Sequence, residues 1–270
     1  MGELLSAPLM NYVPTEAEVT AVQNQPAIAR ALELQRLDMR WESRVEWAWA
    51  TKDYDDRQLI AAAELAMRQS WYDVAINTAE KTKFIHNFVL RYPVPYRETV
   101  KNFSKENGLD EAWVYGLTRQ ESRFVSYAKS GVGASGLMQV MPATAAWIAK
   151  KTGFIDYHQS MIHQTDTNIK LGTYYLRYTL DLMSGQAAMA TAAYNAGPGN
   201  AKHWAPKKSM EGAIYAETIP VSETRQYVQK VMANACFYSH QLGTKALSIK
   251  QRLGIIVGDG SQEVAADDDN

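Results

Sequence analysis

A single carboxylate, Glu121, stands next to a glycine-rich segment in the middle of the chain. It follows Trp113 and Leu117 at intervals of four residues, so in a helix the three side chains share one face, which is apolar. Partial burial on such a face disfavours the charged form of a carboxyl group and raises its pKa. A glutamic acid that stays protonated near neutral pH can protonate a glycosidic oxygen. We therefore interpret Glu121 as a candidate general acid.

The segment after Glu121 predicts a loop whose backbone can approach a ligand closely, because three glycines occur in six residues, at 131, 133 and 136. Residues 122–141, directly after Glu121, contain no second acidic residue. One acid without a partner suits sugar chemistry in which the substrate supplies its own nucleophile. Gln139 and Met141 then alternate onto one side, where they offer an amide and a soft apolar wall.

Each of these features also has an ordinary structural explanation. A glutamate at a helix end can turn to solvent or pair with Arg119 or Arg123, and structural carboxylates far outnumber catalytic ones. The glycines fit a surface turn, and Met141 fits a core position. On this helix alone, the structural explanation of Glu121 is favoured.

A second group of residues follows further along the chain. Tyr194 and Asn195 end a helical pattern, where Gly197 can adopt the left-handed conformation and Pro198 stops the helix. Helix termination explains the glycine and the proline but does not require Tyr194. Glu217 stands at a junction before Ile219-Pro220, where a solvated or arginine-paired glutamate is the simpler interpretation.

Five blocks, taken in order, resemble the soluble lytic transglycosylases of glycoside hydrolase family 23. The blocks are Gln120-Glu121-Ser122, residues 133–142 (GASGLMQVMP), residues 168–176 (NIKLGTYYL), residues 193–199 (AYNAGPG), and residues 217–220 with 222–228 (ETIP, SETRQYV). The resemblance covers about residues 94–240, and five ordered blocks are far more specific than any one alone. One departure is Val125-Ser126, where the family usually has Asn-Pro.

The resemblance implies cleavage of the β-1,4 bond between N-acetylmuramic acid and N-acetylglucosamine in peptidoglycan, with a 1,6-anhydro product. Glu121 would act first as acid and then as base, with Tyr194 against it. No metal and no cofactor is expected. The substrate-binding residues implied are Ser122, Ser135, Gly136, Gln139, Met141, Tyr194, Asn195 and Glu217.

Two other functions are kept open. A goose-type lysozyme-like hydrolase would use water in place of the substrate hydroxyl. A non-catalytic glycan-binding module would keep the binding residues without turnover. Peptidoglycan glycan strands are the expected partner in each case, and cell-wall synthesis or remodelling proteins are further candidate partners.

Composition narrows the class of protein. The chain has 270 residues, enough for one or two domains, and a net charge of −1, which gives no attraction to nucleic acid. Its one cysteine, Cys236, excludes an internal disulfide, and it lies among apolar residues as expected for packing. The five histidines form no metal-ligand spacing on a helix.

Hydrophobic periodicity predicts a mainly α-helical protein, with a loop or small β-like lobe at residues 123–139. The family resemblance implies that the catalytic domain, at 93–245, is lysozyme-like. We expect a small helical linker domain at 1–92 and a C-terminal extension at 246–270. Asp55 or Asp56 and Asp110 are expected to cap helices. Prolines 93 and 95 mark the boundary between the first two parts.

The start of the chain suggests a truncated protein. The start, Met1-Gly2-Glu3, lacks the basic residues and long apolar run of a signal peptide. The family resemblance nevertheless implies a location in the periplasm or at the outer membrane. The last residues, 264–270, form an acidic tail that we expect to be solvated and disordered.

Overall fold

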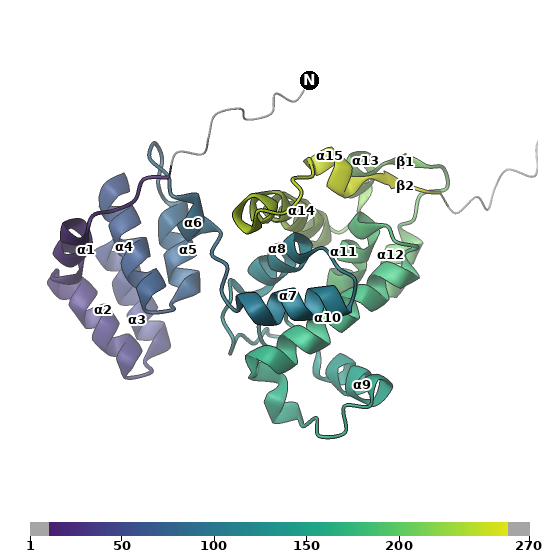
Figure 1. The fold of residues 1–270 in the computed structure, drawn as a ribbon, viewed down its shortest axis with the longest axis horizontal. Helices are drawn as coiled ribbons and strands as arrows, with labels where there is room; N and C mark the ends of the chain where they lie inside the picture. The colour runs from purple at the N-terminus through teal and green to yellow at the C-terminus, as the bar shows by residue number, and fades with distance from the viewer. Residues whose placement is uncertain (1–10, 259–270) are drawn as a thin grey trace, which may run out of the picture. The chain divides into compact units, whose positions relative to one another are not determined.

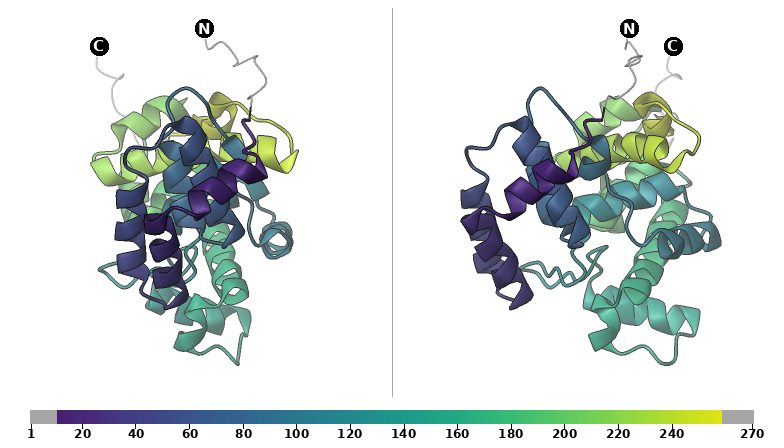
Figure 2. Two further views of the ribbon diagram at one scale, coloured as in Figure 1. Left: turned by 90° about the vertical axis from the view of Figure 1, so that its left-hand side faces the viewer. Right: turned by 60° about the vertical axis from the view of Figure 1, so that its left-hand side comes forward.

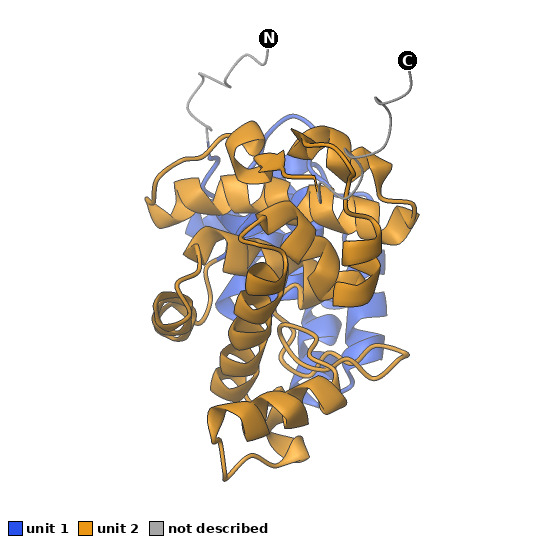
Figure 3. Ribbon diagram, turned by 90° about the vertical axis from the view of Figure 1, so that its right-hand side faces the viewer, with its two compact units in different colours: residues 1–93 blue, residues 94–270 orange. Residues whose placement is uncertain are grey.

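The computed structural model describes residues 11–258, and its architecture is almost entirely helical (Figure 1, Figure 2). The mainly α fold expected from the sequence is confirmed. Two compact units follow one another along the chain, Met1–Pro93 and Val94–Asn270 (Figure 3). We refer to them as the first and the second unit. The acidic tail at 264–270 lies outside the described residues.

The first unit is a set of antiparallel helices packed around tryptophan and alanine. Its helices are α1 (Glu16–Gln23), α2 (Pro26–Arg36), α3 (Arg40–Ala50), α4 (Asp56–Arg68), α5 (Tyr72–Glu80) and α6 (Phe88–Arg91). Trp47 and Trp71 meet edge to face with ring centroids 5.3 Å apart. The indole N–H of Trp47 donates to Thr78 Oγ1, so this buried polar group is satisfied.

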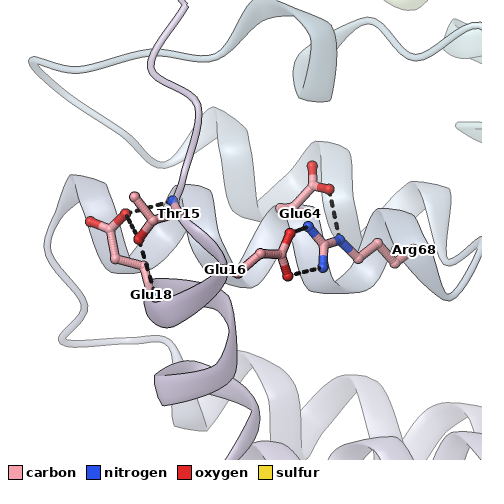
Figure 4. Close-up of polar contacts among 5 residues, drawn as sticks. All are labelled: Thr15, Glu16, Glu18, Glu64 and Arg68. Carbon is pink, nitrogen blue, oxygen red and sulfur yellow. Dashed lines mark hydrogen bonds and ion pairs between the residues drawn. The ribbon is translucent and has the colours of Figure 1, made fainter.

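Local signals start the helices of the first unit. Thr15 and Glu18 form a capping box at the start of α1, and Asp55 forms one with Gln58 at the start of α4, as its sequence position predicted. Arg68 on α4 donates to both Glu64 and Glu16, which ties α1 to α4 at the surface (Figure 4). Ion pairs this exposed contribute little to stability, so the apolar core holds the unit.

The second unit contains the remaining elements. They are α7 (Arg97–Glu106), α8 (Glu111–Ser122), α9 (Pro142–Thr152), η1 (Gln159–His163), α10 (Thr165–Leu182), α11 (Ala187–Ala196), α12 (Pro198–His203), β1 (Met210–Glu211), α13 (Gly212–Thr218), α14 (Ser222–Leu242), α15 (Ile249–Leu253) and β2 (Ile255–Ile256). The long helix α10 packs on α9 and on α11 (Figure 1). The helix α14 packs along α8 and also contacts α11.

Helix α8 is the element that carries the candidate acid, and a glycine sets how closely α14 approaches it. A Cβ at Gly116 would lie 2.7 Å from the backbone oxygen of Val231 and 2.9 Å from the backbone nitrogen of Ala235. Any larger residue there would push the two helices apart. Asp110 caps α8 by accepting the backbone N–H of Ala112 at 2.9 Å, as predicted.

The chain segment after α14 returns to the start of α8. Arg252 of α15 is buried, and its guanidinium donates to Asp110 Oδ2 at 2.6 Å. The strands β1 and β2 form an antiparallel pair, with Met210 opposite Ile256. Residues 249–256 therefore belong to the packed second unit. Among the described residues, no helix combines the length and the apolar character that crossing a bilayer requires.

Residues 123–141 form a loop with two isolated antiparallel bridges, Lys129 with Ser135 and Ser135 with Val140. The loop expected from the glycines is therefore confirmed. The paired strands β1 and β2 lie elsewhere, near the end of the described chain.

Candidate active site

The end of α8 fixes the position of Glu121. The helix ends at Ser122, and Arg123 and Phe124 both take left-handed backbone conformations, with φ of 49° and 66°. Phe124 is buried against Tyr115 and Tyr238, with ring centroids 6.1 and 6.5 Å away. Packing of Phe124 thus holds a backbone conformation that non-glycine residues rarely adopt, directly after the helix end that carries Glu121.

The carboxyl group of Glu121 is crowded by protein although part of the side chain remains exposed. Burial raises the pKa of Glu121 to about 7, and a hydrogen bond from the Tyr227 hydroxyl to Oε1 acts in the opposite direction. The raised pKa that the apolar face of α8 predicted is confirmed. Near neutral pH both forms of the carboxyl group are populated, which allows it to donate and accept a proton.

Two buried tyrosines lie near Glu121, and their hydroxyl groups donate to different acceptors. Tyr227 of α14 donates to the carboxyl group itself, whereas Tyr194 of α11 donates to the backbone oxygen of Met138 at 2.8 Å. Burial raises the pKa of Tyr194 well above its usual value, and the nearby charge of Glu121 adds to this. The family resemblance implied that the Tyr194 hydroxyl lies against Glu121, where it donates to the substrate or holds the carboxyl group. Here Tyr227 donates to the carboxyl group, and the role of Tyr194 toward the substrate stays a prediction.

Sequence reasoning had little chance of finding Tyr227. It lies in the block at residues 222–228, but a tyrosine on the apolar face of a long helix looks like a core residue. Only the packing of α14 against α8 brings its hydroxyl to Glu121, which is 106 positions earlier in the chain.

Asn168 is a second residue that the sequence did not mark as functional. It is fully buried on α10, and its Oδ1 accepts the backbone N–H of Met138 at 2.7 Å. Its amide group donates to the backbone oxygens of Ser135 and Ile162, at 2.9 and 2.7 Å. Asn168 thus satisfies buried backbone groups of the loop beside Glu121 and fixes the shape of that loop.

Gly136 makes this arrangement possible. Its φ is 79°, and a Cβ there would lie 2.2 Å from Asn168 Nδ2. The close approach expected at this glycine therefore involves Asn168. Gly172 does the same further along α10, where a Cβ would lie 2.5 Å from the Met138 sulfur. A Cβ at Gly131 or Gly133 would meet no atom within 4 Å.

Three of the candidate polar side chains hold the loop through its backbone. The Ser122 hydroxyl donates to the Leu137 oxygen at 2.7 Å and accepts the Phe124 N–H at 3.1 Å. The Ser135 hydroxyl donates to the Gly133 oxygen at 3.0 Å. The Gln139 amide donates to the oxygens of Ala128 and Gly136, at 3.2 and 2.8 Å. These contacts use the donors of all three side chains.

The remaining candidates keep exposed surface. Met141, at the start of α9, is 39% exposed. Asn195 at the end of α11 is partly exposed, and its Oδ1 accepts from Thr224 at 2.7 Å. Glu217 on α13 is exposed, and its Oε1 accepts from Gln229 at 2.6 Å.

Other catalytic chemistries find little support. Within residues 11–258 no group of three or more His, Cys, Asp or Glu side chains could hold a metal ion. Cys236 on α14 is partly exposed, and burial raises the pKa of its thiol, so the reactive thiolate is disfavoured at neutral pH.

Family models match most of this architecture. Residues 98–215 match the transglycosylase SLT domain. The chain contains a transglycosylase SLT domain. Residues 21–85, in the first unit, match the L domain of soluble lytic murein transglycosylases, and residues 218–246 match the helical domain of soluble lytic transglycosylases.

Individual proteins similar to this chain agree with these matches. The chain is 32% identical over 229 residues to the soluble lytic murein transglycosylase of Salmonella typhimurium, covering 84% of this chain and 36% of the relative. It is similar to the crystal structure of an inactive Glu-to-Gln mutant of the lytic transglycosylase Slt from Pseudomonas aeruginosa, with a TM-score of 0.80 and 35% identity, over 90% of this chain and 40% of the other.

The 70-kDa soluble lytic transglycosylase of Escherichia coli has a similar structure, with a TM-score of 0.76 and 29% identity, over 91% of this chain and 40% of that chain. The chain thus spans well under half the length of these relatives. The SLT match includes Glu121 and Tyr194 but ends before Tyr227. The hydroxyl that holds Glu121 therefore comes from the stretch that matches the helical domain.

Proposed function

We propose that this chain is a peptidoglycan lytic transglycosylase that cleaves the β-1,4 bond between N-acetylmuramic acid and N-acetylglucosamine. The observation that carries the proposal is Glu121, a single carboxyl group with a pKa raised to about 7 and a hydrogen bond from a buried tyrosine. The SLT domain and its named relatives support the same reaction. Because the chain covers 36% of the Salmonella relative, the activity of a whole relative is not simply transferred to it.

In the proposed reaction Glu121 first donates its proton to the glycosidic oxygen, and the bond between that oxygen and C1 of the muramic residue breaks. The N-acetyl oxygen of the substrate stabilises the cationic centre at C1, so no second carboxylate is required. The ionised Glu121 then removes the proton of the muramic 6-hydroxyl. That oxygen closes onto C1 to form the 1,6-anhydro ring, and Glu121 is protonated again.

Tyr227 is proposed to orient the acid for both steps. Its hydroxyl donates to Oε1 of Glu121, which directs the transferable proton to Oε2. The same hydrogen bond favours the ionised form and so opposes the effect of burial on the pKa. The two effects together leave the carboxyl group close to the point where it can serve as acid and as base.

The other candidate residues are proposed to bind substrate in two ways. Met141, Asn195 and Glu217 have exposed surface and would contact the glycan strand directly. The loop at residues 123–141 would be shaped for substrate by Ser122, Ser135, Gly136 and Gln139, with Tyr194 bracing Met138. Peptidoglycan strands lie in the periplasm, where we propose that the protein acts, with cell-wall remodelling proteins as further partners.

Product analysis tests the proposal directly. Purified peptidoglycan should yield muropeptides that end in 1,6-anhydro-muramic acid, lighter by one water than hydrolysis products and not reduced by borohydride. Glu121→Gln is the matched control and should yield none. New ends that borohydride reduces would identify the goose-type hydrolase, and retained strand binding without any product would identify a binding module.

A further inference from the structure

A row of aromatic rings leads away from the candidate site. The ring of Tyr194, beside Glu121, lies 5.2 Å from that of Tyr175, which stacks on Tyr178 at 6.1 Å. Tyr178 in turn lies 4.8 Å from Trp147, all distances being between ring centroids. Four rings from three helices are therefore in successive contact, beginning at the proposed acid.

Helix spacing explains how the row is built. On α10, Tyr178 follows Tyr175 by three residues and Tyr174 by four, which places its ring near both of the others. Trp147 comes from α9, and its centroid is 6.4 Å from that of Tyr174 as well. Two tyrosine rings thus contact the tryptophan at steep angles, with interplanar angles of 61° and 59°, and hold it in place.

The exposure of Trp147 separates it from the structural tryptophans. Trp47, Trp71 and Trp113 are 2%, 3% and 4% exposed, as expected for core residues. Trp147 is 39% exposed, although its neighbour Ile148 is buried. A supported, flat and partly open aromatic ring has more apolar surface in contact with water than packing of α9 requires.

We propose that Trp147, supported by Tyr174 and Tyr178, is a distal subsite that binds a sugar ring of the same glycan strand that is cleaved at Glu121. The inference rests on the proposed function. Sugar rings present an apolar C–H face that packs against a flat aromatic ring, and the tyrosine hydroxyls can exchange hydrogen bonds with the sugar hydroxyls. The ring row connects Trp147 with the candidate site through packed side chains, and we propose that one strand occupies both.

Charge agrees with a sugar occupant. The ring row itself carries no ionised group, and burial, aided by the proximity of Tyr178, raises the pKa of the Tyr175 hydroxyl. The Tyr175 phenol therefore stays neutral and can donate a hydrogen bond at physiological pH. The aromatic ring itself favours the apolar C–H faces of the sugar rings of the strand.

The proposed subsite predicts that binding depends on the length of the glycan strand. A long strand that reaches Trp147 should bind more tightly than a fragment that fills only the positions next to Glu121. The contact should change binding of long strands and leave the chemical step unchanged, because Trp147 touches no reacting atom.

Paired substitutions at Trp147 test the subsite. Trp147→Leu keeps an apolar side chain against Tyr178 but removes the flat ring, whereas Trp147→Phe keeps a flat ring. Binding of long, peptide-free glycan strands is measured in the inactive Glu121→Gln background. Trp147→Leu should weaken this binding roughly 3- to 10-fold, and Trp147→Phe should weaken it less. Trp41→Leu, at a tryptophan that is 75% exposed in the first unit, should not weaken it.

In the otherwise wild-type protein, Trp147→Leu should raise KM for long strands by a similar factor and leave the shortest cleaved fragment unaffected. Equal loss on short and long substrates, no loss on long ones, or an equal loss with Trp41→Leu would each overturn the subsite. These readings are independent of the proposed function, which fails instead if Glu121→Gln remains active or if no anhydro product forms.

Discussion

Two carboxylates, one in each unit, show how differently the same chemical group is used in this protein. Asp56 in the first unit accepts the backbone N–H groups of Lys83, Phe84 and Ile85, at 2.9, 2.6 and 2.9 Å. Burial alone would raise its pKa, but the three hydrogen bonds outweigh it, and the pKa of Asp56 is lowered. Glu121 accepts a hydrogen bond from one hydroxyl, that of Tyr227. Burial has the larger effect there, and the pKa of Glu121 is raised.

The two units also differ in their use of glycine. Residues 11–93 contain no glycine, and the helices there are joined by tight connections of ordinary residues. In the second unit, Gly116, Gly136 and Gly172 each permit an approach that a Cβ would block. Left-handed backbone at non-glycine residues occurs in both units, at Asp38 and Ser70 in the first and at Arg123 and Phe124 beside Glu121 in the second. The second unit also contains a buried carboxyl group with a raised pKa, where the chemistry is proposed.

The largest expected effect compares the two acids in turnover. Glu121→Gln should lower the rate of peptidoglycan cleavage by at least about 10²–10⁴-fold, because the amide can neither donate nor accept the proton. Asp56→Asn, an equivalent change in the first unit, should leave turnover near the wild-type rate. Clearing of peptidoglycan and helical circular dichroism, measured on the same samples, check both variants. An active, folded Glu121→Gln protein would remove this residue from the mechanism.

The next effect concerns the loop that Asn168 fixes. Gly136→Ala and Gly153→Ala both place a side chain at positive φ, 79° and 69°, which costs about 1–2 kcal/mol. Only at Gly136 would the new Cβ also collide with Asn168, which adds about 1–3 kcal/mol. Urea unfolding should therefore show a clearly larger loss for Gly136→Ala, with activity reduced only in that variant. Equal losses would mean that the loop simply moves aside.

The two acids should also change stability in opposite directions. The folded pKa of Glu121 is above its ordinary value of 4.5, so stability is lost as pH rises from about 4.5 to about 7. Glu121→Gln should hence be more stable than the wild type at pH 8, by up to about 3 kcal/mol, and equal to it at pH 4. The pKa of Asp56 is lowered, so Asp56→Asn should lose about 1–2 kcal/mol at pH 8 and less at low pH. Unfolding at both pH values measures this, and shifts of the same sign would contradict the contrast.

The smallest effects separate the two tyrosines. Tyr227→Phe removes the donor that favours ionised Glu121, so its pKa should rise, the alkaline limb of the pH–rate profile should move upward, and turnover should fall about 10-fold. Tyr194→Phe should instead leave the Met138 oxygen unpaired, lower stability by about 1–3 kcal/mol and reduce the rate less, with the limb unmoved. A limb that moves only in Tyr194→Phe would restore the contact with Glu121 that the family resemblance implied.

The sequence by itself determined the helical class, the helix end that carries Glu121 and the loop beside it. Periodicity indicated a mainly helical protein, Asp55 and Asp110 marked two helix starts, and the glycines between 131 and 136 marked the loop. These are local properties, set by side-chain spacing and by backbone freedom within a few residues. The apolar face of α8 was equally local, which is why the raised pKa of Glu121 could be predicted.

The tertiary structure decided which side chains meet Glu121 and what the conspicuous residues do there. Tyr227 reaches the acid only through the packing of α14 on α8, and Asn168 reaches the loop only through α10. Ser122 and Gln139 turned out to bond the backbone nearby. Contacts between residues tens of positions apart depend on helix packing, and helix packing leaves no short-range pattern in the sequence. Local sequence thus predicted the position of Glu121, and tertiary packing determined which side chains contact it.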